Sequence, residues 1–257
     1  MTPIDTSYAA MQSAPDDDTA RLRFYERFAD GELFLLLDGE AVGDQVSPRL
    51  FDTGEGQFVL VFDTEDRLAQ FAGGPAPYAA VSGRSLAVML SGQGIGIGLN
   101  LDVAPSAILI PSAALSWLQE TLGTSPQETS ATAEVFTPPS GLPDRLIEGL
   151  DAKLASAQGL AKTAYLTGVT YRDGRRGHLL ALIDPAPGAE TALAQAVSEA
   201  LVFSGLDAGE LDVTFFAAGD PATERLEKTG LRFDLPEVQK QATKAPGMDP
   251  NAPPRLR

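Results

Sequence analysis

The stretch Gln57-Phe-Val-Leu-Val-Phe-Asp-Thr-Glu-Asp-Arg-Leu-Ala-Gln-Phe71 changes halfway from a wholly apolar run to a polar pattern with helical spacing. Phe58 to Phe62 is too short to span a membrane and is rich in β-branched and aromatic residues, so it predicts a strand covered on both faces. Asp63 ends this run and is expected to cap the helix that carries Leu68 and Phe71. We therefore expect a buried strand that leads directly into a core helix.

The composition sets the class of protein around this block. The chain has 257 residues, of which 44% are hydrophobic, enough for one large domain or two of ordinary size. Its formal net charge of -16 repels nucleic acid and anionic lipid, so we expect neither as a partner. The sequence contains no cysteine, which excludes disulfides, thiolate nucleophiles and thiolate metal sites.

Residues 1–18 contain no basic region and no continuous apolar segment. Nowhere does the sequence have 18 consecutive apolar residues. The first observation argues against a secretory or transit peptide, and the second against a membrane span. A reducing cytoplasm is compatible with the lack of cysteine. We therefore expect a cytoplasmic protein.

The pattern of elements predicts an α+β protein with two small mixed domains joined by a linker rich in Pro, Ser and Thr. Residues 1–17 are expected to form a flexible arm, with the aspartates Asp16 to Asp18 capping the first helix. Strands and helices then alternate irregularly over residues 18–122, which predicts an N-terminal α+β domain.

Residues 123–140 have little apolar periodicity and form the predicted linker, although residues 133–136 are apolar enough to pack as a strand. Residues 141–236 read as helix, hairpin, helix, strand and helix, a second α+β domain. Its clearest signal is Asp173-Gly174, because both positions of a tight hairpin turn tolerate positive φ. The polar, proline-rich residues 237–257 are predicted to be disordered.

Two motifs invite a chemical interpretation. The glycines of Gly92-Gln-Gly-Ile-Gly-Ile-Gly98 alternate after a helix and enter a strand, whereas a dinucleotide loop follows a strand and opens a helix. We therefore predict a helix stop followed by a strand with close backbone approach. His178, the only histidine, follows the hairpin turn and is expected to be an exposed or half-packed strand residue.

We find no catalytic, cofactor-binding or metal-binding residue in the sequence, and we expect no cofactor and no enzymatic activity. Four residues are candidate contacts for a ligand or partner. Tyr78, Arg84 and Asn100 are polar residues that border turns between adjacent elements. Trp117 is expected in the core or at a domain interface, with a binding patch as the alternative.

Several blocks of the first half resemble the N-terminal domain of the SseB family, whose name refers to enhanced serine sensitivity. The blocks are residues 24–37, Leu60-Val-Phe-Asp-Thr-Glu-Asp-Arg-Leu-Ala-Gln-Phe71, residues 78–90 and Gly98-Leu-Asn100. In the second half, the helix after Pro143, Ala164-Tyr165, His178-Leu-Leu-Ala-Leu182 and Val213-Thr-Phe-Phe216 are similar to the family's C-terminal domain. The resemblance implies a bacterial cytoplasmic protein with no established reaction and supplies no catalytic residues.

Two functions remain open. The first and preferred one is a non-enzymatic protein-interaction or regulatory module, which predicts an exposed apolar patch and a protein partner that the sequence does not identify. The alternative is a protein that binds a small molecule, an amino acid being one such ligand, in a cleft between the two domains. That function predicts a concave pocket with a few convergent polar groups. The sequence does not specify the oligomeric state.

Overall fold

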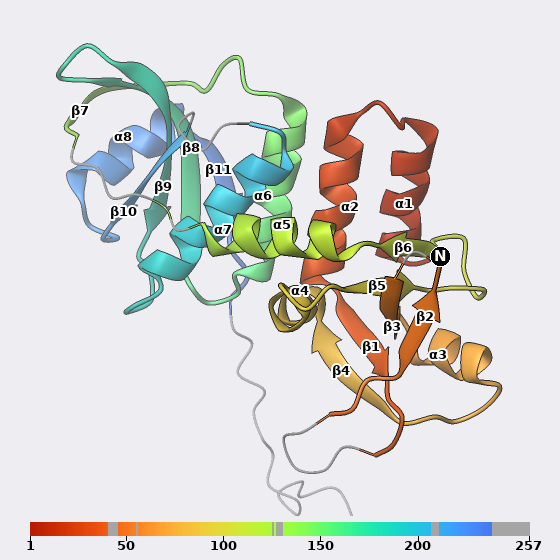
Figure 1. Cartoon of the computed structure of the whole chain (residues 1–257). Helices are drawn as coiled ribbons and strands as arrows, with labels where there is room; N and C mark the ends of the chain where they lie inside the picture. Colours follow the sequence, from red (N-terminus) through yellow and green to blue (C-terminus); the bar gives the residue numbers. More distant parts are fainter. Residues whose placement is uncertain (41–45, 55, 125, 127–130, 207–210, 238–257) are drawn as a thin grey trace, which may run out of the picture.

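The computed structural model describes residues 1–40, 46–54, 56–124, 126, 131–206 and 211–237 (Figure 1). Two mixed sheets, each with its own helices, form two α/β regions, so the predicted α+β class with two small layers is confirmed. The segment 238–257, most of the tail predicted to be disordered, lies outside the described residues.

The first region contains five helices and six strands among the described residues. They are α1 (Pro3–Ser13), α2 (Asp18–Asp30), β1 (Glu32–Leu36), β2 (Leu50–Thr53), β3 (Gly56–Phe62), α3 (Glu65–Ala72), β4 (Tyr78–Ser82), α4 (Gly83–Leu90), β5 (Ile95–Leu99), β6 (Ile108–Ile110) and α5 (Ser112–Gly123). The sheet order is β4-β1-β3-β5-β6, and β2 also pairs with β3.

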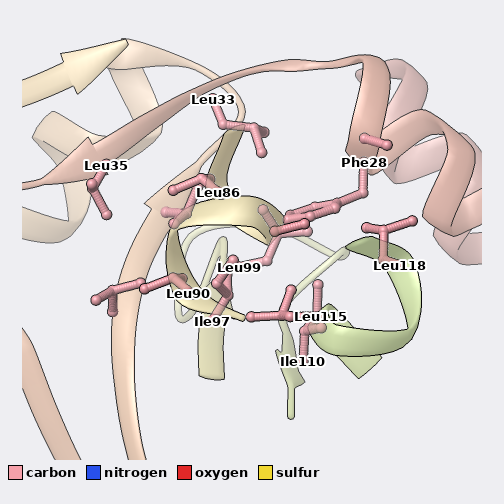
Figure 2. Close-up of a cluster of buried hydrophobic side chains, with 14 of the residues drawn as sticks. Phe28, Leu33, Leu35, Leu86, Leu90, Ile97, Leu99, Ile110, Leu115 and Leu118 are labelled. Carbon is pink, nitrogen blue, oxygen red and sulfur yellow. The ribbon is translucent and has the colours of Figure 1, made fainter. Parts of the chain in front are cut away.

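Strand β3 lies at the centre of this sheet and is buried from Phe58 to Phe62, as predicted. On one face, Val59 and Val61 pack into the large cluster formed with α2, α4 and α5, part of which is drawn in Figure 2. On the other face, Leu60 and Phe62 pack against α3. Burial on both faces explains why this strand has no polar position between Phe58 and Phe62.

The cap of α3 differs from the prediction. Thr64, not Asp63, is the N-cap residue, and its hydroxyl accepts a hydrogen bond from the Arg67 amide. Asp63 instead binds the Arg67 guanidinium from one helical turn away, with oxygen to nitrogen distances of 2.7 and 2.9 Å. Threonine and aspartate both make good N-caps, so the sequence alone did not distinguish the two positions.

The alternating glycines enter strand β5, as predicted, and two of them are required by packing. A Cβ atom at Gly96 would lie 2.6 Å from the Phe58 ring, and one at Gly98 would lie 2.7 Å from Leu101. These side chains cover the face of β5 that the glycines leave open. The motif therefore reflects close packing in the sheet rather than a phosphate-binding loop.

The N-terminus departs from the predicted flexible arm, because residues 3–13 form helix α1. Thr2 and Asp5 make a reciprocal capping box, and Pro3 occupies the first turn, where a missing amide proton has no cost. Ile4 and Asp5 are buried. Among the predicted aspartate caps, Asp17 caps α2 by accepting a hydrogen bond from the Thr19 amide.

The second region contains five strands and three helices among the described residues. They are β7 (Ala133–Thr137), α6 (Asp144–Ser156), β8 (Thr163–Tyr171), β9 (Arg176–Ile183), α7 (Glu190–Phe203), β10 (Leu211–Phe216), α8 (Pro221–Thr229) and β11 (Leu231–Asp234). The sheet order is β10-β9-β8-β11, and β7 pairs with β8. Helices α6 and α7 cover one face, and α8 packs against the other.

Strands β7 and β11 both pair with β8 in this sheet. The linker residues that were apolar enough for a strand form β7, which pairs antiparallel with β8. Strand β11 was not predicted. It pairs with the first half of β8, residues 163–166, along the same edge whose second half pairs with β7. The β8–β9 hairpin has the predicted turn, in which Gly174 adopts a φ of 84°.

The two regions share part of a core. Phe203, near the end of α7, is 1% exposed and belongs to the hydrophobic cluster of the first sheet. Near the end of α5, the Leu122 carbonyl accepts a hydrogen bond from the Gln195 side chain of α7, at 2.9 Å. The second region is therefore packed directly on the first at α7.

Candidate functional site at the junction of the two sheets

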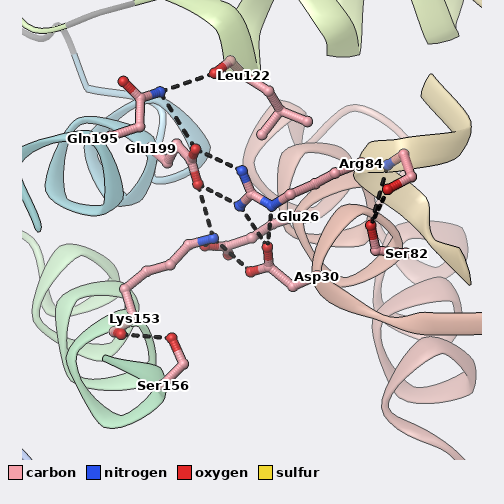
Figure 3. A network of polar contacts seen from close by, with 10 residues as sticks. Glu26, Asp30, Ser82, Arg84, Leu122, Lys153, Ser156, Gln195 and Glu199 are labelled. Atoms are coloured by element: carbon pink, nitrogen blue, oxygen red, sulfur yellow. Dashed lines mark hydrogen bonds and ion pairs between the residues drawn. The ribbon is translucent and has the colours of Figure 1, made fainter. Parts of the chain in front are cut away.

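Five charged side chains meet where α2 and α4 of the first region face α6 and α7 of the second (Figure 3). We call Glu26, Asp30, Arg84, Lys153 and Glu199 the junction network. Arg84 binds both Glu199 oxygens, at 2.7 and 2.5 Å, and reaches Asp30 at 2.6 Å. The Lys153 ammonium lies 2.5 Å from Asp30, 3.3 Å from Glu199 and 3.6 Å from Glu26. The network thus joins the two regions by charge as well as by packing.

Burial makes these contacts costly to break. The side chains of Lys153 and Glu199 are only 6% and 4% exposed. A buried charge without a partner is strongly destabilising, whereas charges that are paired and hydrogen-bonded are tolerated. Each of these two groups has at least two oppositely charged neighbours, so neither is left uncompensated.

The network contains three carboxylates and two cations, and its pKa shifts reflect this imbalance. Burial would raise the pKa values of Asp30 and Glu199, but Lys153 and Arg84 outweigh it and lower both. Burial also raises the pKa of Glu26, and the attraction of Lys153 does not offset it. Glu26 is therefore the surplus carboxylate of the junction network.

Long side chains of α2 and α6 bridge the two helices at regular intervals. Arg145 donates to the Thr19 hydroxyl at 3.1 Å, and Arg23 donates to Glu148 at 2.6 Å. The Lys153 contacts with Glu26 and Asp30 continue the series one to two turns further along. Residue numbers rise together on both helices, so α2 and α6 point the same way and present facing rows of polar side chains.

A groove of about 960 Å³ lies between α1, α2 and α6. Helix α1 lines it with small side chains and hydroxyl groups, among them Thr6, Ser7, Ala10 and Ser13. Helices α2 and α6 contribute the charged side chains Arg23, Glu26, Arg27, Arg145 and Glu148. Both regions of the protein therefore build this groove, and its charged wall adjoins the junction network through Glu26.

Three charged groups of the groove have bonding capacity left. Within the described part of the chain, Arg27 forms no ion pair or side-chain hydrogen bond. The Arg145 Nε atom is buried and has no hydrogen-bond partner there. A buried donor without an acceptor costs about 1–3 kcal/mol. Together with the surplus carboxylate of Glu26, these groups can bind a molecule that carries both charges.

The α1 wall of the groove is held by a second polar network. Arg67 binds Asp5 of α1 at 3.1 and 2.5 Å, and it also binds Asp63. The Ser106 hydroxyl donates to Asp5 at 2.7 Å, and the Thr2 hydroxyl donates to Asp63 at 2.5 Å. Burial acts to raise the pKa of Asp5, but Arg67 and Ser106 outweigh it and hold the pKa well below its usual range. Because these charges are satisfied internally, we assign this network a structural role.

The structure does not bring the four sequence-predicted contacts together. Arg84 belongs to the junction network. Tyr78 is 40% exposed on strand β4, with its ring against Phe34. Asn100 is fully buried and bonds the Asp63 amide and the Ser106 hydroxyl, beside the Arg67 network. Trp117 is 36% exposed and packs edge-on against Tyr25 of α2.

The other junction residues were missed by sequence reasoning. Glu26, Asp30, Lys153 and Glu199 come from three helices in the two regions, and no spacing in the sequence relates them. The one available signal was a lysine at position 153 among the apolar positions of α6. Lys153 follows Leu146 and Leu150 by helical spacing and precedes Leu154, so it lies toward the buried side of that helix.

His178, the only histidine, lies outside the junction network. The His178 ring is half-buried on β9, and its Nε2 atom lies 3.0 Å from the Ser140 carbonyl, as expected for a strand residue beside a turn. In the described ranges, no group of three or more His, Asp or Glu side chains is placed to hold a metal ion. No helix of those ranges has the length and apolar character needed to cross a bilayer.

The fold and the groove define a two-sheet α+β protein with a charged groove where its two halves meet. Residues 8–117 match the family model described as the SseB protein N-terminal domain, from within α1 to Trp117. Residues 8–117 are therefore similar to an SseB N-terminal domain. The match does not extend to the second sheet, so the resemblance to the family's C-terminal domain is not supported. Searches of curated proteins and of solved structures returned no match.

Proposed function

We propose that this chain is a non-catalytic binding module that holds a small zwitterionic molecule in the groove between α1, α2 and α6. An amino acid is the simplest member of this ligand class. The observation that carries the proposal is the presence, on one groove, of two guanidinium groups with unused donors and one surplus carboxylate. A cytoplasmic location is part of the proposal.

The proposed pose follows from charge. The guanidinium groups of Arg27 and Arg145, which line the groove, would donate to a carboxylate, and hydrogen bonds to charged groups are about twice as strong as neutral ones. Glu26 accepts from an ammonium group, which would also supply the positive charge that the junction network lacks. The α1 hydroxyl groups remain for polar substituents of the ligand.

Two features favour binding over catalysis. Arginine keeps its proton at all accessible pH values, so Arg27 and Arg145 can hold an anion but cannot transfer a proton. Glu26 makes its ion-pair contact with Lys153 rather than with a hydroxyl that it would activate as a nucleophile. The volume of about 960 Å³ lies within the range of small-molecule pockets.

The proposal predicts that Arg27→Gln and Arg145→Gln each weaken ligand binding by roughly tenfold or more, the loss of a charge-assisted hydrogen bond. The measurement is isothermal titration of the full chain with glycine, serine and glutamate, with acetate and ethylamine as half-ligand controls. Arg21→Gln is the matched control, because Arg21 lies on α2 in an exposed pair with Asp18 and does not line the groove.

Two results would contradict the small-ligand proposal. One is the absence of binding by any of the three zwitterions at saturating concentration. The other is binding that Arg27→Gln and Arg145→Gln leave as tight as in the Arg21→Gln control. If acetate bound as tightly as glycine, the ammonium group would contribute nothing. Glu26 would then have no role in binding, and the ligand class would be simple anions.

The protein-interaction module, preferred from the sequence, is the second candidate. One observation favours it: Val88 and Met89 are neighbours on α4 and are 64% and 40% exposed. The charged groove favours the small-ligand proposal, so this function is placed second. It predicts that Val88→Glu abolishes capture of one specific protein that the wild type retains, and unchanged capture of that protein would count against it.

A further inference from the structure

A separate pocket lies on the face of the second sheet against which α8 packs. It has a volume of about 350 Å³ and is bounded by β7, β9, β10 and α8. We call it the outer pocket. Its apolar walls are Phe136, Tyr171, Leu179 and Phe216. Three of these four side chains are aromatic, so the cavity offers ring faces and edges rather than flexible aliphatic chains.

The acidic group of the outer pocket is already neutralised. Asp212 accepts a hydrogen bond from the Tyr171 hydroxyl at 2.5 Å and forms an ion pair with Arg175 at 3.0 Å, both through Oδ2. The Arg175 guanidinium lies 4.1 Å from the centroid of the Tyr171 ring. Burial first, and then Asp212, raise the pKa of Tyr171, so its phenol keeps its proton. Tyr171, Arg175 and Asp212 form a fixed wall that leaves no net charge.

The basic group of the outer pocket is not neutralised. Arg225 on α8 lies 4.8 Å from the centroid of the Phe136 ring and donates one N–H to the Glu134 carbonyl at 2.8 Å. In the described part of the chain it has no carboxylate partner. A guanidinium has five N–H donors, so most of its hydrogen-bonding capacity remains available at the pocket.

We propose that the outer pocket binds a planar aromatic carboxylate of one or two rings. The ring would lie among Phe136, Tyr171 and Phe216, where aromatic pairs add stabilisation beyond that of the area they bury. The carboxylate would pair with the planar fork of Arg225. The cavity volume is near the lower end for ligand pockets, which sets the limit of two rings.

This site shares no residue with the groove between α1, α2 and α6. It also differs in chemistry, because the outer pocket supplies aromatic walls and a single uncompensated cation. The two proposals therefore succeed or fail separately. A ligand of either site is assigned by the arginine whose loss removes its binding.

Saturation-transfer NMR on the full chain tests this proposal, with benzoate and indole-3-carboxylate as probes and benzylamine and acetate as controls. The expected result is binding of the two aromatic carboxylates, weakened about tenfold or more in Arg225→Gln. Arg232→Gln is the matched control, because Arg232 sits in an exposed ion pair with Asp234 outside the pocket. Ala222→Phe, which fills the cavity without changing charge, is expected to abolish binding.

Three outcomes would overturn the proposal. The first is benzoate affinity in Arg225→Gln or Ala222→Phe equal to that of Arg232→Gln. The second is benzylamine binding as tightly as benzoate. The third is loss of benzoate binding in Arg27→Gln with no loss in Arg225→Gln, which would assign the probe to the groove instead.

Discussion

Of the three carboxylates at the junction, Glu26 lies farthest from its cationic partner. Its nearest cation, Lys153, lies at 3.6 Å and is also in contact with Asp30 and Glu199. Burial raises the pKa of Glu26 above its ordinary value of 4.5, whereas the cations lower the pKa of Asp30 below 3.8. Two carboxylates within one network therefore respond to pH in opposite directions.

Glu26→Gln is expected to stabilise the protein at neutral pH. In the wild type, the unfolded chain ionises Glu26 near pH 4.5 while the folded chain keeps its proton to higher pH, so stability is lost as pH rises through that interval. The variant escapes this loss. Its gain in free energy of unfolding is therefore absent below about pH 4.5 and reaches a plateau above the raised pKa.

Asp30→Asn is expected to have the opposite effect on stability. Both variants are measured by urea unfolding at several pH values. Asp30 stabilises the fold above its unfolded pKa of about 3.8, and this contribution disappears as pH falls through the lowered folded pKa. The variant should therefore be less stable than the wild type at neutral pH and approach it in acid. A neutral-pH loss in Glu26→Gln as large as that in Asp30→Asn would contradict the assignment of Glu26 as surplus.

Individual site residues were the least predictable feature of the sequence. Arg84 was selected because it borders a turn, and it does belong to the junction network. The partners of Arg84 could not be predicted, because Asp30 on α2 and Glu199 on α7 are far apart in the sequence and come together only in the folded chain. Asn100 and Trp117 were also chosen from local sequence. Asn100 lies beside the Arg67 network, and Trp117 packs against Tyr25.

Helix α1 shows how one element decides whether a site exists. It forms one wall of the groove, and it is attached to α3 through Arg67, Asp5 and Asp63. The Arg67 side chain is 15% exposed, and the two aspartates are 3% and 4% exposed. Removing the cation would leave two buried carboxylates without compensation.

Arg67→Met is therefore expected to cost about 3 kcal/mol or more of stability, as measured for other buried pairs that lose one partner. In Arg67→Met, the amides of α1 should exchange hydrogen faster than in the wild type, while the amides in the rest of the chain keep their protection. Arg49→Met is the control, because Arg49 pairs with Asp38 on an exposed surface, where an ion pair contributes about 1 kcal/mol or less. Unchanged protection of α1 in Arg67→Met would show that its apolar contacts alone hold it.

At the scale of elements, periodic patterns were predictable and short or cap-dependent ones were not. The buried strand β3, the helix after it and the glycine-rich β5 follow from local sequence. Strand β11 has four residues and only Phe233 buried, too little for a periodic signal. The capping box at Thr2 and Asp5 was readable, but the lack of a continuous apolar segment near the N-terminus favoured an arm, and the wall of the groove was missed with it.

For the whole molecule, the junction network and Phe203 make the two regions one packed unit. Lys153 contacts three carboxylates across this junction and lies 5.9 Å from the centroid of the Phe203 ring. Its loss would leave Arg84 alone against Glu26, Asp30 and Glu199. Repulsion among these carboxylates would then act against the packing of α2 on α6 and α7.

Lys153→Met is expected to destabilise the protein by about 3–5 kcal/mol. In calorimetry the wild type should unfold in one transition, and the variant should resolve two, one for each sheet. Arg23→Met is the control across the same two helices, because Arg23 and Glu148 are exposed and their pair contributes about 1 kcal/mol or less. Equal, small effects of both variants would contradict a role for the network in joining the regions.

The two-region organisation was predictable because composition changes sharply between residues 123 and 140. The relation between the regions was not, since it depends on buried charges that sequence patterns assign to solvent. The same limit applied to the groove, which exists only where α1, α2 and α6 come together. The sequence therefore left the function between two classes.

The most direct test of the central claim is a chemical-shift map of the full chain titrated with serine. Serine is expected to cause shift changes that saturate and concentrate on α1, α2 and α6 around Arg27 and Arg145, and that disappear in the Arg27→Gln, Arg145→Gln double variant. Shift changes confined to α4 near Val88, to the outer pocket, or to no part of the structure would contradict it.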